Sequence, residues 1–327
     1  MILIIPLFGH LLTSILILAV PNLPRRELLF GVVVPVDFRS SPEGRRAIRI
    51  FRCVVAVPAI AGLIAIALWG SRSVPVVTSM AAIGTSLAGA LTFVAMNRKF
   101  KSFAVQPQSV RVFELNTGPE RLPWFTWLGL VPLLIVLAAA LYLHANWDSI
   151  PPRYPVHWDI HGTPNSWADR SVQSVYGALA FGAEMAAWFF GFALALWYGS
   201  RQSEPLRRPM VGFSVTVGWS FALMMAGVAL GRVIHLPVGV VAVAWLPILL
   251  GAGYLIKKSN EPRDPDLTPD ECWKSGMIYY NPNDAALFVA RRYGVGLTSN
   301  MANPWSWVML ASIPVLIATG FLLTRLL

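Results

Sequence analysis

A series of long apolar segments is the feature that most constrains what this chain can fold into. A helix needs roughly 20 mainly apolar residues to cross a hydrocarbon core about 30 Å thick. Eight segments meet that requirement: residues 2–20, 53–70, 75–97, 124–143, 173–199, 211–231, 236–256 and 305–323. Because 56% of the residues are hydrophobic and only 13% are charged, an ordinary water-soluble fold is excluded. The sequence predicts an all-α integral membrane protein with about eight transmembrane helices.

The distribution of basic residues predicts the orientation of these helices. Arg25 and Arg26 follow the first apolar segment, and no cleavage pattern is present, so we expect that helix to be retained with its N-terminus outside. Alternating from this start places 21 of the 26 Lys and Arg residues on the inner side. Cytoplasmic loops carry such an excess. Both termini are therefore predicted to face outward.

Two inner connections are long enough to carry structure of their own. Residues 21–52 include Arg45, Arg49 and Arg52 at helical spacing. This pattern fits either a basic face against anionic lipid headgroups or an ordinary positive-inside anchor. Residues 257–304 contain two strand-like stretches, 277–280 and 287–289, on either side of the turn-forming residues 281–284. We expect these strands to pair in a small cytoplasmic β-hairpin cap.

The outer connection, residues 144–171, concentrates residue types that the rest of the chain mostly avoids: three His, three Trp, three Asp and two Arg. Its four prolines disfavour a helix, and its Trp rings favour a structured loop over a disordered one. One interpretation is a turn whose Trp side chains anchor it at the interface. The other is a binding surface, in which His157, Asp159, Asp169 and Arg170 add polar contacts to the stacking area of the Trp rings.

The same segment contains two histidines at the spacing of a metal site. His157 and His161 are four residues apart with Asp159 between them, a spacing that suits zinc on a helix. However, Gly162 and Pro164 follow at once, and the Glu of the zinc-protease motif is absent. We therefore predict no metal and no cofactor.

Catalysis and nucleic-acid binding are also disfavoured. The two cysteines, Cys53 and Cys272, form no metal-ligand pattern, and no serine or cysteine lies in a nucleophile elbow. An enzyme is the least favoured class. The basic residues lie between apolar segments and not on a polar domain, so membrane orientation explains the net charge of +10 better than nucleic acid does.

The outer connection also carries a recognisable motif. The pattern Arg153-x-Pro155-x-His157-Trp158-Asp159-x-x-Gly162-x-Pro164-Asn165-x-Trp167-x-x-Arg170 resembles the signature of a widespread bacterial membrane domain of unknown function. That domain is also found in the family of immunity proteins against the sporulation-delaying toxin. Asn165 stands where an acidic residue is expected, and Arg170 stands where lysine is usual. The resemblance implies the bacterial inner membrane and a ligand- or partner-binding role for Pro155, His157, Trp158, Asp159, Gly162, Pro164, Trp167 and Arg170.

The C-terminal inner segment resembles a second uncharacterised domain that often accompanies the first. The matching residues are Trp273-Lys274-x-Gly276, Tyr280-Asn281-Pro282-x-Asp284, Phe288-Val289 and Arg292-x-Gly294-x-Gly296-x-Thr298-x-Asn300. Phe30-Gly31-Val32-x-Val34-Pro35 is similar to a short motif in the first inner loop of such proteins. The resemblance names relatives that mostly lack an assigned activity, so it predicts a cytoplasmic motif without a reaction.

One carboxyl group is expected inside the membrane. Glu184 lies near the middle of the segment 173–199, where an ionised side chain costs at least about 2.5 kcal/mol. Such residues face a cavity or a partner, and His10 and Arg232 are the candidate partners on the outer half. Glu184 is either a proton- or ion-linked site or a carboxyl group packed between helices.

These observations predict five regions. They are a three-helix membrane region with basic inner loops (1–123), a helix pair carrying the outer loop (124–199), helices six and seven (200–256), a cytoplasmic hairpin segment (257–304) and a C-terminal transmembrane helix (305–327). By resemblance, the expected function is recognition or sensing at the outer surface, with a peptide ligand outside and anionic lipid headgroups inside. A subunit of a larger membrane complex with protein partners, and a transporter that uses Glu184, are the alternatives.

Overall fold

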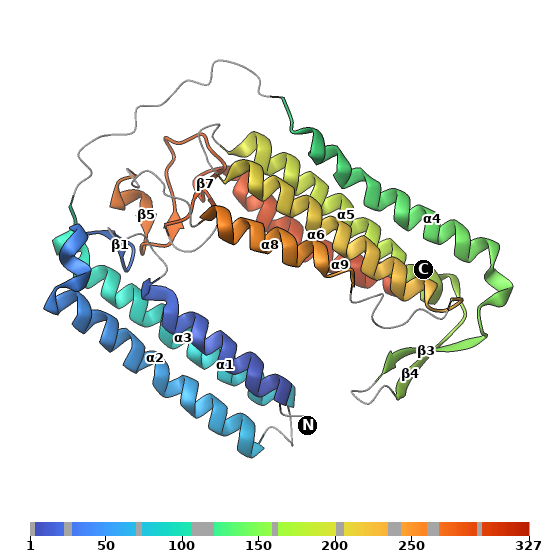
Figure 1. Ribbon diagram of the computed structural model, residues 1–327, viewed down its shortest axis with the longest axis horizontal. Helices are drawn as coiled ribbons and strands as arrows, with labels where there is room; N and C mark the ends of the chain where they lie inside the picture. The colour runs from blue at the N-terminus through green and yellow to red at the C-terminus, as the bar shows by residue number, and fades with distance from the viewer. Residues whose placement is uncertain are drawn as a thin grey trace. The chain divides into compact units, whose positions relative to one another are not determined.

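The computed structural model describes residues 4–22, 28–69, 74–105, 121–158, 163–200, 206–234, 243–259, 268–292 and 296–326 (Figure 1). The chain divides into two compact units, each described by itself. The first unit comprises residues 1–114, 263–280 and 291–294. The second unit comprises residues 115–262, 281–290 and 295–327. The segment predicted as one cytoplasmic region is therefore shared between the two units.

Helices form most of both units. The first unit contains α1 (Ile4–Ala19), α2 (Pro42–Trp69) and α3 (Val74–Phe100). The second contains α4 (Val131–Ala145, preceded by the 3₁₀ turn η4, Trp124–Leu130), α5 (Val172–Gly199), α6 (Arg207–Leu230), α8 (Leu246–Ser259) and α9 (Pro304–Leu326). Within the described residues, five helical stretches are long and apolar enough to span a membrane: 42–69, 76–103, 124–145, 172–199 and 207–230. The chain is thus a mostly helical, multi-pass membrane protein.

Side chains on the outside of the helices support a bilayer as the solvent. Val57 on α2, Leu91 on α3 and Leu250 on α8 are 69%, 69% and 72% exposed. Many other Leu, Ile and Val side chains along these helices are exposed as well. Soluble proteins rarely expose apolar patches of this extent, whereas lipid covers them at no cost.

Helix α2 begins at Pro42, eleven residues before the predicted segment 53–70. Its first turns are amphipathic, because Ala47 and Phe51 are buried whereas Arg45, Arg49 and Arg52 are exposed. The predicted helical spacing of these arginines is confirmed, and their contact with lipid headgroups stays a prediction. The apolar-run criterion placed the start of α2 too late because it excludes turns that carry arginine on one side.

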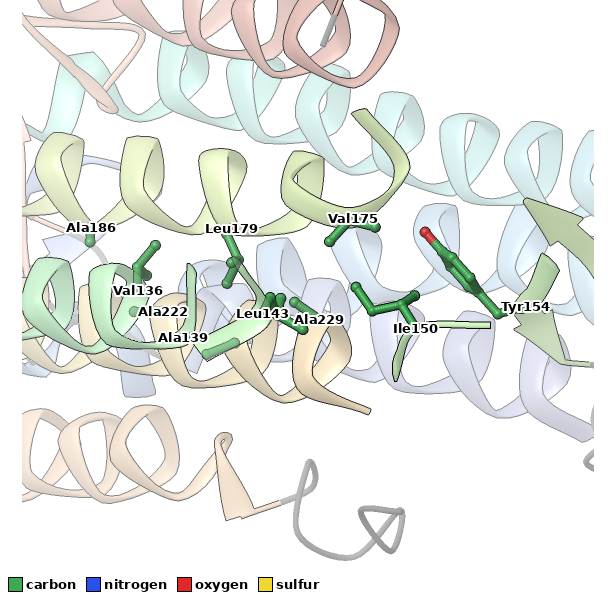
Figure 2. Close-up of a cluster of buried hydrophobic side chains, with 11 residues drawn as sticks. Val136, Ala139, Leu143, Ile150, Tyr154, Val175, Leu179, Ala186, Ala222 and Ala229 are labelled. Atoms are coloured by element: carbon green, nitrogen blue, oxygen red, sulfur yellow. The ribbon is translucent and has the colours of Figure 1, made fainter. Parts of the chain in front are cut away.

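Small residues allow the helices of the second unit to pack closely. Figure 2 shows their shared core, to which α4 contributes Ala139 and Leu143, α5 contributes Leu179 and Ala186, and α6 contributes an alanine stripe that includes Ala222. Alanine at such positions lets helix backbones approach closely. In a membrane this close packing stabilises helix contacts, because water supplies no hydrophobic driving force there. These contacts hold α4, α5 and α6 together.

The strands of the described residues form four two-stranded antiparallel sheets. In the first unit, β1 (Leu28–Leu29) pairs with β2 (Val32–Val33), and β5 (Trp273–Lys274) pairs with β6 (Ile278–Tyr279). In the second unit, β3 (Arg153–Trp158) pairs with β4 (Pro164–Asp169), and β7 (Phe288–Ala290) pairs with β8 (Leu297–Ser299). Figure 1 shows β1 and β5 at the same end of the three-helix unit.

The predicted pairing of strands 277–280 and 287–289 is wrong, although strands lie at both places. Strand β6 pairs backward with β5 through a tight turn at Ser275 and Gly276, whose φ angles are +51° and +74°. Strand β7 pairs forward with β8. The left-handed conformation at two successive residues is the geometry of a compact hairpin turn, so the chain reverses earlier than the polar residues 281–284 suggest.

Candidate functional site

The outer connection folds into the β3–β4 hairpin, which we call the arm. Its register pairs Arg153 with Asp169, Tyr154 with Ala168 and Pro155 with Trp167, and it is interrupted by bulges between Pro155 and Trp158. Proline lacks the N–H that a regular ladder needs, which accounts for the irregularity next to Pro155. The prediction of a structured, non-helical segment agrees with this hairpin.

One face of the arm is built into the core of the second unit. Tyr154 is 3% exposed and packs in the same cluster as Ile150 and Val175 (Figure 2). Its cross-strand neighbour Ala168 packs against that cluster too. The arm is therefore attached to the helices through its first cross-strand pairs.

Arg170 fixes the base of the arm. One guanidinium nitrogen, Nη1, donates to the carbonyl oxygens of Trp147 and Ile150, each at 3.0 Å. The guanidinium carbon also lies 5.8 Å from the centroid of the Trp147 ring, and that ring stacks on Tyr176 of α5. Satisfying two loop carbonyls with one charged donor stabilises the turn that leads into the arm. Arg170 thus acts as an anchor in this structure.

The exit from the arm is also well defined. The side chain of Ser171 accepts a hydrogen bond from the backbone N–H of Ser174. The Ser174 hydroxyl in turn accepts from the backbone N–H of Ser171 and donates to the carbonyl oxygen of Asp169. This reciprocal capping box satisfies N–H groups at the start of α5. Helix α5 therefore begins at a fixed point directly after the arm.

The opposite face of the arm is open. Trp167 is 49% exposed and Val156 is 42% exposed, and Val172 at the start of α5 is 53% exposed. Pro155 and Pro164 are half-buried. The backbones of His157 and Trp158 lie in β3, but their side chains, together with residues Asp159, His161 and Gly162, are outside the described residues.

Arg232 lies in the turn after α6 and not inside a membrane helix. Its Nη1 donates to the carbonyl oxygen of Val175 in the first turn of α5, and its guanidinium carbon lies 5.0 Å from the centroid of the Tyr154 ring. Burial lowers the pKa of Arg232 from its ordinary value, and the neighbouring Tyr154 offsets part of this effect. Tyr154 was missed at the sequence level, although its place in a strand directly after the polar Arg153 is a signal for an inward-facing position, because successive side chains of a strand point to opposite faces.

Glu184 has a different partner from those expected. Its Oε1 accepts from the hydroxyl of Thr319 on α9, while Oε2 is buried and has no hydrogen-bond partner within the described ranges. Four residues further along the same interface, the indole of Trp188 donates to Ser312 at 3.0 Å. Arg232 instead bonds Val175. The carboxyl group therefore belongs to a polar seam between α5 and α9.

His10 also has a partner within its own unit. Its Nε2 lies 3.1 Å from the carbonyl oxygen of Ala59 on α2, and its side chain is 2% exposed. A Cβ atom on Gly62 would lie 2.4 Å from the same nitrogen, so the imidazole occupies the space that this glycine leaves. His10 is a packing residue of the first unit.

In the first unit, three distant motifs meet at Arg292. The guanidinium, with its side chain 1% exposed, donates to the carbonyls of Gly31 and Thr268 and forms a 2.5 Å ion pair with Asp270. It also lies 4.9 Å from the centroid of the Trp273 ring. Buried charges are tolerated only with such a set of partners. Sequence reasoning identified Arg292 and Trp273 but missed Asp270, whose only signal was its place in an acidic run.

Two glycines allow the hairpins of this unit to touch. A Cβ atom on Gly31 would lie 2.4 Å from the Cα of Gly276, and both residues have positive φ angles, +79° and +74°. The amide of Asn97 at the end of α3 passes beside them and donates to the carbonyl of Phe30 at 2.8 Å. The motifs Phe30-Gly31 and Trp273-Lys274-x-Gly276 are thus two sides of one contact.

In the second unit, the residues 281–284 are organised by Asn300, which is fully buried. Its Oδ1 accepts from the backbone N–H of Asn281 at 3.0 Å, and its Nδ2 donates to the carbonyls of Asn281 and Asp284, both at 2.9 Å. Nearby, Leu287 donates its N–H to the carbonyl of Gly199 at the end of α5. The side-chain amide of Asn300 thus makes the hydrogen bonds to the backbone of residues 281–284 that a neighbouring strand would otherwise make.

The remaining residues of the predicted cytoplasmic motif lie on the surface. Lys274 is exposed, and its ammonium group lies 5.7 Å from the centroid of the Tyr280 ring, which is 44% exposed. Pro282 is an exposed residue of the Asn300-bound loop. This motif therefore has a buried structural part and a smaller exposed part.

With this geometry in place, comparison with known families identifies two regions. Residues 134–180 match a domain of unknown function, DUF1648. Residues 282–307 match a family of unknown function, DUF5808. The first match covers part of α4, the arm and the start of α5, and the second covers the Asn300-bound loop, β7, β8 and the start of α9. No curated protein and no solved structure matches the chain.

The two matches agree with the prediction of two uncharacterised domains, and both fall on the segments that cap α5. Among the described residues, no group of three or more His, Cys, Asp or Glu side chains could hold a metal ion. The arm presents the exposed apolar side chains of Val156 and Trp167 beside the exposed Arg153.

Proposed function

We propose that the chain crosses the cytoplasmic membrane of a bacterium eight times, with both termini outside. The support is the coincidence of predicted apolar segments with helices and the bias of Lys and Arg toward one side. Helix α5 has 28 residues, about 40 Å at 1.5 Å per residue, with the arm at its first end and Ser200 bridging to Phe288 at its other end. A helix of this length separates an outer from an inner surface.

We propose further that the arm binds an apolar or amphipathic peptide at the outer surface. The observation that carries this proposal is the half-exposed Trp167 on a hairpin whose base is fixed by Arg170 and Tyr154. A rigid, exposed Trp is the type of side chain that dominates peptide and protein interfaces, because it adds contact area with little loss of conformational entropy. By the resemblance of the arm motif, the role is immunity to, or sensing of, a membrane-active peptide.

Photocrosslinking in intact bacterial cells tests this proposal. Benzoylphenylalanine is placed at position 167, and the cells are treated with tagged amphipathic peptides built from Leu and Lys. We expect a peptide adduct after irradiation, and none when the same residue replaces Tyr198, which is 71% exposed at the opposite end of α5. Cells carrying Trp167→Ala at normal protein levels should lose any protection against those peptides.

Two outcomes would overturn the proposal. One is the absence of an adduct from position 167 with all tagged peptides, under conditions where lipid adducts form. The other is equal growth inhibition by these peptides in cells with and without the chain. Immunoblotting for the full-length protein excludes loss of expression as the cause.

A second candidate, an ion- or proton-linked transporter, is favoured by one observation. The Oε2 atom of Glu184 is buried and has no hydrogen-bond partner in the described part of the chain, and a Cβ atom on Gly320 would lie 3.5 Å from it. Transport in proteoliposomes that depends on a pH gradient and is abolished by Glu184→Gln would support this candidate. Unchanged transport in that variant would remove it.

A further inference from the structure

The outer ends of α5 and α6 carry polar groups that the protein itself does not saturate. The Tyr154 hydroxyl is buried and has no hydrogen-bond partner among the residues that the structure describes, and the same is true of the hydroxyl of Tyr176. In Figure 2 the Tyr154 hydroxyl points toward the first turn of α5, where Val175 is labelled. The carbonyl of Val175 accepts from Arg232. The unpartnered phenol and the guanidinium are therefore directed to the same place.

Arg232 has donors left for a ligand. Within the described part of the chain, its hydrogen bond runs from Nη1 to Val175, and its other contact is with the face of the Tyr154 ring. A guanidinium offers five N–H donors, and a phosphate or carboxylate can accept two of them side by side. Leaving half-buried donors and a buried hydroxyl without acceptors is costly, so an acceptor group is expected between them.

The depth of this place identifies the kind of acceptor. Arg232 lies two residues after Leu230, the last residue of α6, and Val175 lies in the first turn of α5, so in the proposed orientation both are at the outer boundary of the membrane-spanning helices. Trp147 stacks on Tyr176 at the same level, as aromatic side chains do at the headgroup layer. At that depth the abundant anionic group is the phosphate of a phospholipid.

We propose that Arg232 and Tyr154 hold the phosphate of an outer-leaflet phospholipid beneath the arm. The guanidinium donates to the phosphate oxygens, and the Tyr154 hydroxyl donates to a further oxygen. Because Tyr154 belongs to β3, a lipid bound there ties the arm to the membrane surface. This proposal concerns a lipid site at the base of the arm and does not depend on a peptide binding to its tip.

Native mass spectrometry of the full-length protein in mild detergent, titrated with phosphatidylglycerol, tests the proposal. Tyr154→Phe keeps the ring and removes only the hydroxyl, and Arg232→Lys keeps the charge and removes the planar guanidinium. We expect each variant to weaken the tightest lipid adduct at least about tenfold, as expected for losing one hydrogen bond to a charged group. The matched controls are Tyr198→Phe and Arg208→Lys, exposed residues at the opposite ends of α5 and α6, which should change binding less than twofold.

Competition experiments separate the sources of the anion. Diacylglycerol with the same acyl chains lacks the phosphate and should not displace the adduct. Displacement by millimolar inorganic phosphate would mean that a free anion and not a lipid is the ligand, and displacement by an acidic peptide would assign the site to peptide binding. Equal lipid binding by wild type, Tyr154→Phe and Arg232→Lys would overturn the proposal outright. A thermal unfolding curve for each variant in lipid-free detergent shows that the fold is intact.

Discussion

Arg292 donates a hydrogen bond to the carbonyl oxygen of Gly31 at 2.9 Å, although 261 positions separate the two residues in the chain. The bond joins the hairpin after α1 to a segment close to the last helix. The bond is buried, and the ion pair between Arg292 and Asp270 reinforces it. It therefore contributes to the stability of the first unit. Substitutions at four residues test this contact and the contacts that hold the arm and residues 281–300 in place.

Arg292→Ala should destabilise the protein strongly. The change leaves Asp270 and the carbonyls of Gly31 and Thr268 without their shared donor, and breaking a buried ion pair costs about 3–5 kcal/mol. Thermal unfolding in detergent, followed by tryptophan fluorescence, measures the loss. Arg46→Ala, an exposed arginine on α2 of the same unit, is the control and should stay within about 0.5 kcal/mol. Similar curves for both variants would contradict the assigned role.

Gly31→Ala should be destabilising although it adds a single methyl group. The new Cβ would lie 2.4 Å from the Cα of Gly276, and the φ angle of +79° is unfavourable for alanine. Gly84→Ala on α3 is the matched control, because no atom lies within 4 Å of the added Cβ. In a helix that change is favourable by about 0.5–1 kcal/mol. Opposite shifts of the unfolding temperature are expected, and shifts of the same sign would refute the close contact.

Asn300→Asp should be as damaging as Asn300→Ala. The Asn300 amide uses its oxygen as an acceptor and its nitrogen as a donor to two carbonyls, and a carboxylate would direct negative charge at those carbonyls. Each variant should lose about 1–3 kcal/mol of stability. Protease accessibility of residues 281–300 in inverted vesicles measures the opening of this loop. If Asn300→Asp behaved as wild type while the exposed Asn283→Ala did not, the assignment would fail.

Arg170→Lys should preserve the arm, whereas Arg170→Ala should release it. Both hydrogen bonds to Trp147 and Ile150 come from the same nitrogen, so one ammonium group can replace them. Limited proteolysis from the outer side of intact cells reports on the arm, with at least about tenfold faster cleavage expected for Arg170→Ala from the loss of these two charged hydrogen bonds. Equal cleavage of the two variants would contradict this explanation.

The sequence predicted those parts of the fold that depend on local pattern. Apolar length identified the helices, and the Pro- and Trp-rich composition predicted a structured, non-helical arm. The helical spacing of Arg45, Arg49 and Arg52 was confirmed because a period of 3.6 residues is visible in the sequence itself. The extended start of α2 was missed because hydropathy alone defines a membrane segment and not a helix end.

Partners in space were beyond reach from a single sequence. Glu184 bonds Thr319, and nothing local distinguishes that threonine from others in apolar helices. The pairing of β6 with β5 depended on the φ angles of Ser275 and Gly276, whereas the more conspicuous turn residues 281–284 are bound by Asn300. Motif matching found most residues of the buried contacts but could not show that they are structural.

The first unit has a consequence for the time course of biosynthesis. Its helices α1, α2 and α3 leave the ribosome early, whereas residues 268–292, which complete its β1–β5 end, are made only when most of the chain exists. Until then the carbonyl of Gly31 lacks its donor from Arg292, and the apolar β1–β2 hairpin lacks its neighbour β5. The earliest part of the protein therefore reaches its native state late, and a prematurely terminated chain presents an unfinished surface that membrane quality control can detect.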